Sequence, residues 1–120
     1  MYFSREEKNA IQRMITAMVA ADGRIDAKEV VLNTVVNAKI GITQEHNEAS
    51  LNMSLQEAVE IVKRMTPDEK RFVCAYLGTM MSIDSDVDAN EMLLWSLLTS
   101  TCGFPQMTIA EAATIIANIK

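Results

Sequence analysis

Residues 21–41, ADGRIDAKEVVLNTVVNAKIG, recur in altered form 62 positions further along the chain as residues 83–103, IDSDVDANEMLLWSLLTSTCG. Each copy opens with an acidic turn, continues through an apolar stretch and closes on a glycine. Glycine commonly follows the end of a helix, because it adopts the left-handed conformation there without strain. Each copy therefore predicts an acidic turn followed by one helix, from about 26 to 39 and from about 88 to 101.

The repeat extends on both sides of these copies. The same offset of 62 relates the upstream segments, and beyond the glycines the offset becomes 54. The first repeat unit, residues 4–65, therefore contains an insertion of eight residues relative to the second unit, residues 66–120. The insertion falls within residues 43–53, a polar stretch that we expect to form a loop and that holds the single histidine, His46.

Each unit predicts three helices. The first helices open with capping boxes, Ser4 to Glu7 and Thr66 to Glu69, while serine or threonine also precedes each third helix. Apolar residues follow a helical spacing in both units, and no segment alternates as a strand does. We therefore predict an all-α, single-domain bundle of about six helices, built from two duplicated three-helix units. A chain of 120 residues is long enough for one such domain.

The overall composition excludes several classes of function. The net charge is −5 and the pI is near 4.8, so the surface repels nucleic-acid phosphates and anionic lipids. We expect no nucleic-acid partner and no direct insertion into a membrane. Cys74 and Cys102 lack the spacing of metal ligands and are expected to be buried free thiols. The first residues, MYFSREEKN, contain no export signal, which predicts a cytoplasmic location.

The acidic turn of the second unit holds the main candidate site. No lysine or arginine occurs from Phe72 to Ile119, so its carboxylates crowd together without a cation nearby in sequence: Asp84, Asp86, Asp88 and Glu91. A bound divalent cation, or a basic partner surface, would relieve their repulsion. We predict a calcium or magnesium site at these four residues. It should bind more weakly than an EF-hand, because the first and third ligand positions of such a loop fall on Met80 and Ser82.

The acidic turn of the first unit is a weaker candidate metal site. Its carboxylates are Asp22, Asp26 and Glu29, and the neighbouring Arg24 and Lys28 can neutralise them. A purely structural interpretation is also open in both units. Each turn ends in aspartate followed three residues later by glutamate, which is itself a capping-box pattern. We therefore expect the aspartate that precedes each second helix to be its N-cap.

Two further side chains leave alternatives open. His46, flanked by acidic residues, is expected to be a solvated loop residue rather than a metal ligand. Trp95 either fills the interface between the units or forms an exposed anchor for a partner, and we expect it to be buried.

The acidic helix-turn-helix in each unit resembles the TerB-like tellurite-resistance family. Five residues match that family's pattern in the first turn and three in the second, where Ser85 replaces the usual glycine: Ala21, Asp22, Gly23, Ile25 and Glu29, then Asp84, Val87 and Glu91. The resemblance covers essentially the whole chain. It implies an all-helical, cytoplasmic bacterial domain, also found as the N-terminal domain of a DnaJ-type membrane co-chaperone. It further implies protein partners near the membrane, a generic divalent-metal site and no enzymatic reaction.

The sequence thus leaves two classes of function. The first is a non-catalytic interaction module that contacts a protein partner through the acidic turns, with a divalent cation as a candidate ligand. The alternative is a small carboxylate-dependent metalloenzyme, such as a metallohydrolase, with Asp84, Asp88 and Glu91 as metal ligands. The chain lacks a glycine-rich phosphate loop, a histidine-rich ligand set and a nucleophile-base pair, so we predict the non-enzymatic function.

Overall fold

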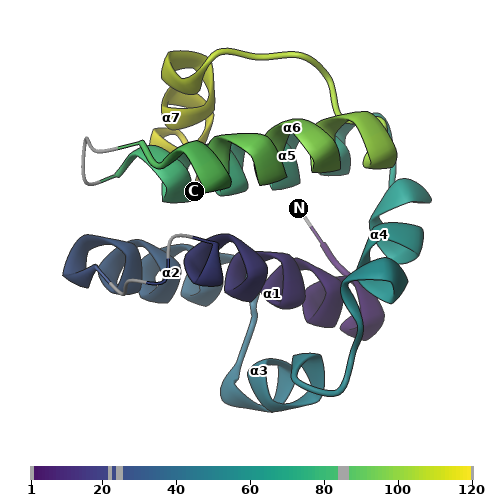
Figure 1. The fold of residues 1–120 in the computed structure, drawn as a ribbon. Coiled ribbons are helices and arrows are strands. Elements are labelled where there is room, and N and C mark those ends of the chain that lie inside the picture. Colours follow the sequence, from purple (N-terminus) through teal and green to yellow (C-terminus); the bar gives the residue numbers. More distant parts are fainter. Residues whose placement is uncertain (1, 22, 24–25, 84–86, 120) are drawn as a thin grey trace.

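The fold is all-α, as the sequence predicts. A computed structural model describes residues 2–21, 23, 26–83 and 87–119, and these residues contain helices but no strand. The helices are α1 (Arg5–Ala20), α2 (Ala27–Ile40), α3 (Gln44–Ser50), α4 (Leu55–Lys63), α5 (Pro67–Ser82), α6 (Ala89–Cys102) and α7 (Ile109–Ala117) (Figure 1). No helix in this described part of the chain is both long enough and apolar enough to cross a membrane.

The helix bounds follow the repeat. Helices α1 and α5 both have 16 residues, α2 and α6 both have 14, and α4 and α7 both have nine. The first two pairs begin 62 residues apart and the third pair 54 residues apart, which are the offsets read from the sequence. The two units therefore share one helical plan.

Helix α3 corrects the prediction of a polar loop between residues 43 and 53. The insertion folds as a seven-residue helix that packs against α1, so the described chain has seven helices rather than six. Its start is fixed by His46, whose Nδ1 accepts a hydrogen bond from the Thr43 backbone N–H at 2.9 Å. An ion pair of 3.0 Å between Arg5 and Glu45 links it to α1. The missed signal is a threonine followed three residues later by a side chain that can reach back.

The predicted helix ends are confirmed. The capping boxes at Ser4 and Thr66 form with both of their hydrogen bonds, and Pro67 occupies the first turn of α5. Gly41 and Gly103, which follow α2 and α6, have φ angles of 79° and 73°. These left-handed conformations disfavour any other residue, so the two glycines fix where the second helices stop.

The first helix of each unit forms the centre of the core. Helix α1 packs against α4 and α5 against α7, and α1 and α5 also pack against each other. Their apolar faces are almost completely buried, including Met14, Met18, Tyr76 and Met80. Helix α5 is buried over ten consecutive residues, from 72 to 81. The second helices, α2 and α6, lie on the outside of this centre and carry the features described next.

Candidate functional site: the second helices and their acidic turns

The predicted site residues in the acidic turns are only partly within the described structure. Asp22, Asp84 and Asp86 lie outside the described residues. Asp26 is the N-cap of α2, where its Oδ1 accepts the Lys28 backbone N–H at 2.7 Å. Asp88 is the N-cap of α6, with its Oδ1 accepting two backbone N–H groups, at 2.8 and 3.3 Å. The predicted capping roles of Asp26 and Asp88 are therefore confirmed.

Glu29 and Glu91, the glutamates of the two turns, do not form the hydrogen bonds expected of a capping box. Glu29 and Glu91 do not bond back to the N–H groups of Asp26 and Asp88, although equivalent bonds form at the starts of α1, α5 and α7. Instead, Glu29 is 2% exposed and Glu91 is 1% exposed. The two glutamates are thus buried at equivalent positions of the two units. The sequence pattern of a capping box did not reveal this.

The predicted metal site includes two residues that the structure describes, Asp88 and Glu91. Among the described residues, no group of three or more histidine, cysteine, aspartate or glutamate side chains could hold a metal ion. Asp88 and Glu91 are the described members of the predicted cation site, and Asp88 Oδ1 is already engaged in capping. Calcium prefers six to eight oxygen ligands. These two residues would therefore supply only a small share of a coordination shell.

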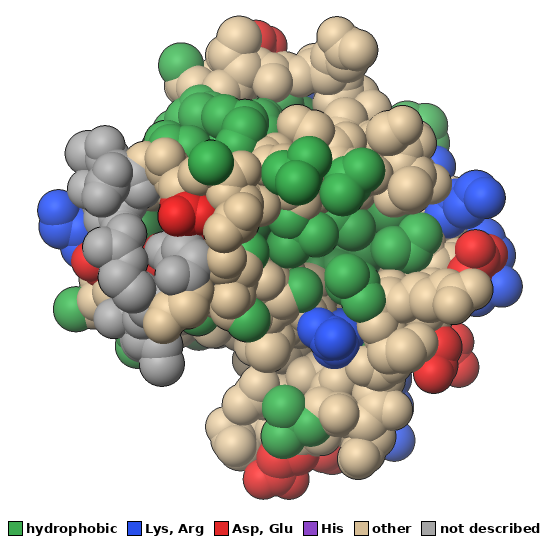
Figure 2. All heavy atoms as spheres, in the orientation of Figure 1, with side chains coloured by type: hydrophobic (Ala, Val, Ile, Leu, Met, Phe, Trp, Pro, Cys, Tyr) green, Lys and Arg blue, Asp and Glu red, His purple; other side chains and the backbone are tan. Residues whose placement is uncertain are grey.

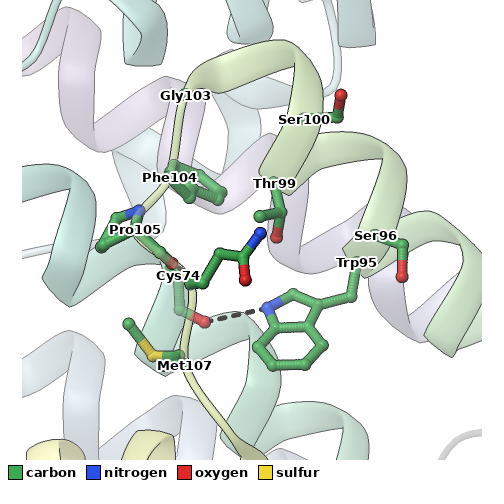
Figure 3. Close-up of a pocket in the computed structure, with 10 residues that line it drawn as sticks. Cys74, Trp95, Ser96, Thr99, Ser100, Gly103, Phe104, Pro105 and Met107 are labelled. Atoms are coloured by element: carbon green, nitrogen blue, oxygen red, sulfur yellow. Dashed lines mark hydrogen bonds between the residues drawn. The ribbon is translucent and has the colours of Figure 1, made fainter.

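Helix α6 is anchored by Trp95, which is buried as predicted. Its indole N–H donates to the Cys74 carbonyl oxygen at 3.1 Å, which ties α6 to α5 (Figure 3). Gly78 on α5 makes room for the ring, because a Cβ there would lie 2.9 Å from Trp95 Cζ2 and 3.2 Å from Ala112 Cβ. Helix α6 also packs against α1 and α4. Helix α6 is thus in contact with three other helices.

Helix α2 is anchored by polar contacts instead. Asn33 takes the place that Trp95 has in the second unit, and its Oδ1 lies 2.8 Å from the Tyr76 hydroxyl oxygen. Asn37 Oδ1 lies at the same distance from that hydroxyl, and Asn37 Nδ2 donates to Gln12 Oε1 at 2.9 Å. Burial raises the pKa of Tyr76 far above its usual range, so the hydroxyl stays protonated. This small amide-hydroxyl network links α2 to α5.

Both second helices expose apolar side chains at equivalent positions. Val31 is 62% exposed and its counterpart Leu93 is 60% exposed. The same correspondence holds for two more pairs, Val30 with Met92 and Val35 with Leu97. Figure 2 shows hydrophobic side chains gathered over the middle of the face that carries α6, with most charged side chains toward its margins. Because these apolar side chains are exposed at equivalent positions of both units, their exposure belongs to the repeated unit and not to a single position.

On α2 the exposed side chains line a groove, which we call the α2 groove. It has a volume of about 410 Å³ and lies between α2 and the residue that follows α5, with walls formed by Ala27, Lys28, Val31, Leu32, Val35 and Ile83. Among the wall residues that the structure describes, Lys28 is the only charged one. The sequence analysis did not identify this groove. The available signal was the excess of apolar residues on α2 beyond those needed for its buried face.

A second cavity, of about 560 Å³, lies between α6 and the segment that leads to α7 (Figure 3). Trp95 and Thr99 line it from α6, while Pro105 and Met107 line it from the connecting segment. Burial raises the pKa of the Cys74 thiol at its edge, which disfavours the reactive thiolate. The described residues of its wall are uncharged, and its cysteine is held mainly as the thiol.

Comparison with solved structures shows a protein that is similar to this chain. The chain is 38% identical to a protein of unknown function from Porphyromonas gingivalis whose crystal structure is known. The two structures have a TM-score of 0.85, and the match covers 98% of this chain and 92% of that one. No protein-family model matches the sequence, and no curated protein matches it significantly.

Proposed function

We propose that this chain, which belongs to the same family as the Porphyromonas gingivalis protein of unknown function, is a non-catalytic protein-interaction domain. The observation that carries the proposal is the repeated exposure of apolar side chains on α2 and α6. Exposed apolar patches on a stable domain are typical of protein-binding surfaces. Because the exposure recurs at equivalent positions, each unit offers one binding helix.

The TerB-like resemblance supports the same class of function. The resemblance implies a bacterial cytoplasmic domain with protein partners near the membrane and a connection to tellurite or stress resistance. In this proposal the acidic turns stand at the start of the two binding helices, since α2 and α6 begin directly after them. A partner that contacts an exposed helix would therefore also meet the adjoining turn.

A divalent cation at the acidic turn of the second unit is part of this proposal. Asp84, Asp86, Asp88 and Glu91 would hold calcium or magnesium, and waters would complete the shell. Such an ion would stiffen the turn that leads into α6 rather than take part in a reaction. The first unit, with Asp22, Asp26 and Glu29, should bind less tightly, because Arg24 adds a positive charge there.

The alternative function is a carboxylate-dependent metalloenzyme. A metalloenzyme needs a concave site beside its metal ligands. Neither Asp88 nor Glu91 lines the α2 groove or the cavity beside Trp95. For the described ligands Asp88 and Glu91, this placement favours the interaction domain over the enzyme.

The test is partner capture from the native cell by the wild-type domain and by a variant that carries Val31→Ser, Val35→Ser, Leu93→Ser and Leu97→Ser. These side chains are exposed, so the variant should stay folded, which circular dichroism checks. We expect a protein that the wild type retains and the variant loses, and that binds the purified wild-type domain directly. Identical captured proteins for both would contradict the proposal.

A further inference from the structure

We propose that the α2 groove binds an amphipathic helix of a partner protein that carries an acidic residue beside its apolar row. This inference rests on the proposed function and specifies the partner for one of its two faces. Helix-in-groove binding needs an apolar channel that accepts side chains spaced three or four residues apart. Val31 and Val35, four residues apart on α2, line such a channel together with Ile83.

The composition of α2 is hard to explain without a partner. Val30, Val31 and Val35 are all exposed and β-branched. Valine has a lower helix propensity than alanine, lysine or glutamate, because its side chain loses rotamer freedom in a helix. In addition, apolar side chains gain nothing from exposure to water. A helix that faced only solvent would be more stable with polar residues at these positions, so the valines fit a surface that is covered when the domain works.

The packing of α2 leaves this face accessible. Helix α2 packs mainly against α5, whereas α6 packs against α1, α4 and α5. The buried positions of α2 are Glu29, Val36 and Ile40, which form one narrow stripe. The groove lies beside this stripe, so a partner helix could fill it without displacing any core residue.

Charge selects the chemistry of the partner. Lys28 is exposed on the groove wall, and within the described part of the chain it has no ion pair. An acidic residue on a bound helix would pair with it at the edge of an apolar contact. In a second copy of this chain, the exposed apolar face of α6 could not form this pair, because it has no charged residue from Met92 to Cys102. An anionic membrane is opposed by the net charge of −5 and by the concave shape of the groove.

The test is selection from a phage-displayed library of 16-residue amphipathic peptides on the wild-type domain and on three variants. The first is Val31→Ser with Val35→Ser, the second is Lys28→Glu, and the third, a matched control on the other unit, is Leu93→Ser with Leu97→Ser. We expect enriched peptides with an apolar row and an aspartate or glutamate beside it. Methyl NMR shifts should place them at Val31, Val35 and Ile83.

The variants distinguish the outcomes. The serine pair on α2 should abolish enrichment, the α6 pair should leave it unchanged, and Lys28→Glu should weaken the acidic peptides by about two- to fivefold and favour basic ones. Peptides that depend on Leu93 and Leu97 alone would overturn this inference and leave the interaction domain standing. Peptides that depend on neither face would overturn both.

Two further results would overturn the inference in favour of another occupant. One is a concentration-dependent shift of the Val31 and Val35 methyl signals without peptide, which would make the groove a contact between copies. The other is binding to phosphatidylglycerol vesicles that is lost with Val31→Ser and Val35→Ser, which would make it a membrane contact.

Discussion

The second helices of the two units have equal lengths and the same start and stop signals, yet they are held differently. Helix α6 is fixed by a buried tryptophan and packs against three helices. Helix α2 buries Val36 and Ile40, is linked to Tyr76 of α5 through two asparagines, and packs mainly against that one helix. The position that holds Trp95 in one unit holds Asn33 in the other.

In the duplicated unit, the bounds of the second helix and the strength of its attachment to the core are therefore set by different residues. Caps and glycines, which are local, set the helix bounds in both units. The anchor residue sets how firmly each second helix is held and how much of its apolar surface remains open. The unit with the weaker anchor carries the apolar α2 groove, whereas the cavity on α6 is lined by the anchor Trp95 itself.

Removing the two anchors should have very different costs. Trp95→Ala should lower the free energy of unfolding by about 3–5 kcal/mol, because it leaves a large cavity against α5. Asn33→Ala should cost only about 1 kcal/mol, the usual value of a hydrogen bond. Urea unfolding of both variants provides the measurement. Equal losses of stability in the two variants would contradict a weaker anchor for α2.

Filling the space beside the tryptophan should also destabilise the second unit. Gly78→Ala gains about 1 kcal/mol of helix propensity, but the new methyl group would lie 2.9 Å from Trp95 Cζ2. Overpacking of this kind costs about 1–3 kcal/mol. We expect a net loss of stability in thermal unfolding. A gain would show that the ring can move and that the anchor of α6 is loose.

The polar anchor of α2 depends on one hydroxyl group. Tyr76→Phe should cost about 1–2 kcal/mol, because it leaves the oxygens of Asn33 and Asn37 without their buried donor. The effect should be local, with faster amide exchange in α2 than in α6. Tyr2→Phe, at an exposed tyrosine, is the matched control and should change neither quantity.

The two N-caps should contribute nearly equally. Asp26→Ala and Asp88→Ala should each cost about 1 kcal/mol, with Asp88 the larger because it accepts two backbone N–H groups. Chemical denaturation of both variants decides this. If neither substitution has an effect, the aspartates serve another purpose, such as binding the cation.

The smallest expected effect is a dependence of stability on pH, which comes from His46 in the insertion. Burial, followed by the charge of Lys8, lowers the pKa of His46 from its ordinary value of 6.5. The unfolded chain therefore binds the proton more readily, so the contribution of His46 to stability is fully present above pH 6.5 and is lost as the pH falls below that value and through the lower pKa of the folded state. An NMR titration of His46 should give a midpoint below 6.5, and His46→Gln should remove the dependence. A midpoint above 6.5 would be the contrary result.

Much of the fold was predictable because its signals are local. Each first helix begins at a capping box, and each second helix ends at a glycine with positive φ. The short helix α3 was missed because its cap uses His46, which is not a usual capping-box partner.

The candidate site was less predictable, because it depends on tertiary packing. Helix α2 is apolar on several sides, so spacing alone cannot tell which valines face the core. Only the packed structure shows that Val36 is buried and that Val31 is exposed. The inward position of Glu29 likewise follows from packing, since the sequence pattern around it also fits a capping box.

Native-state hydrogen exchange tests the contrast between the units most directly. The comparison uses equivalent amides at buried positions, Val36 against Leu98 and Ile40 against Cys102. Because α2 has the weaker anchor, its amides should exchange through openings that cost at least about 1 kcal/mol less than those of α6. Equal protection of the two helices, or greater protection of α2, would contradict the account.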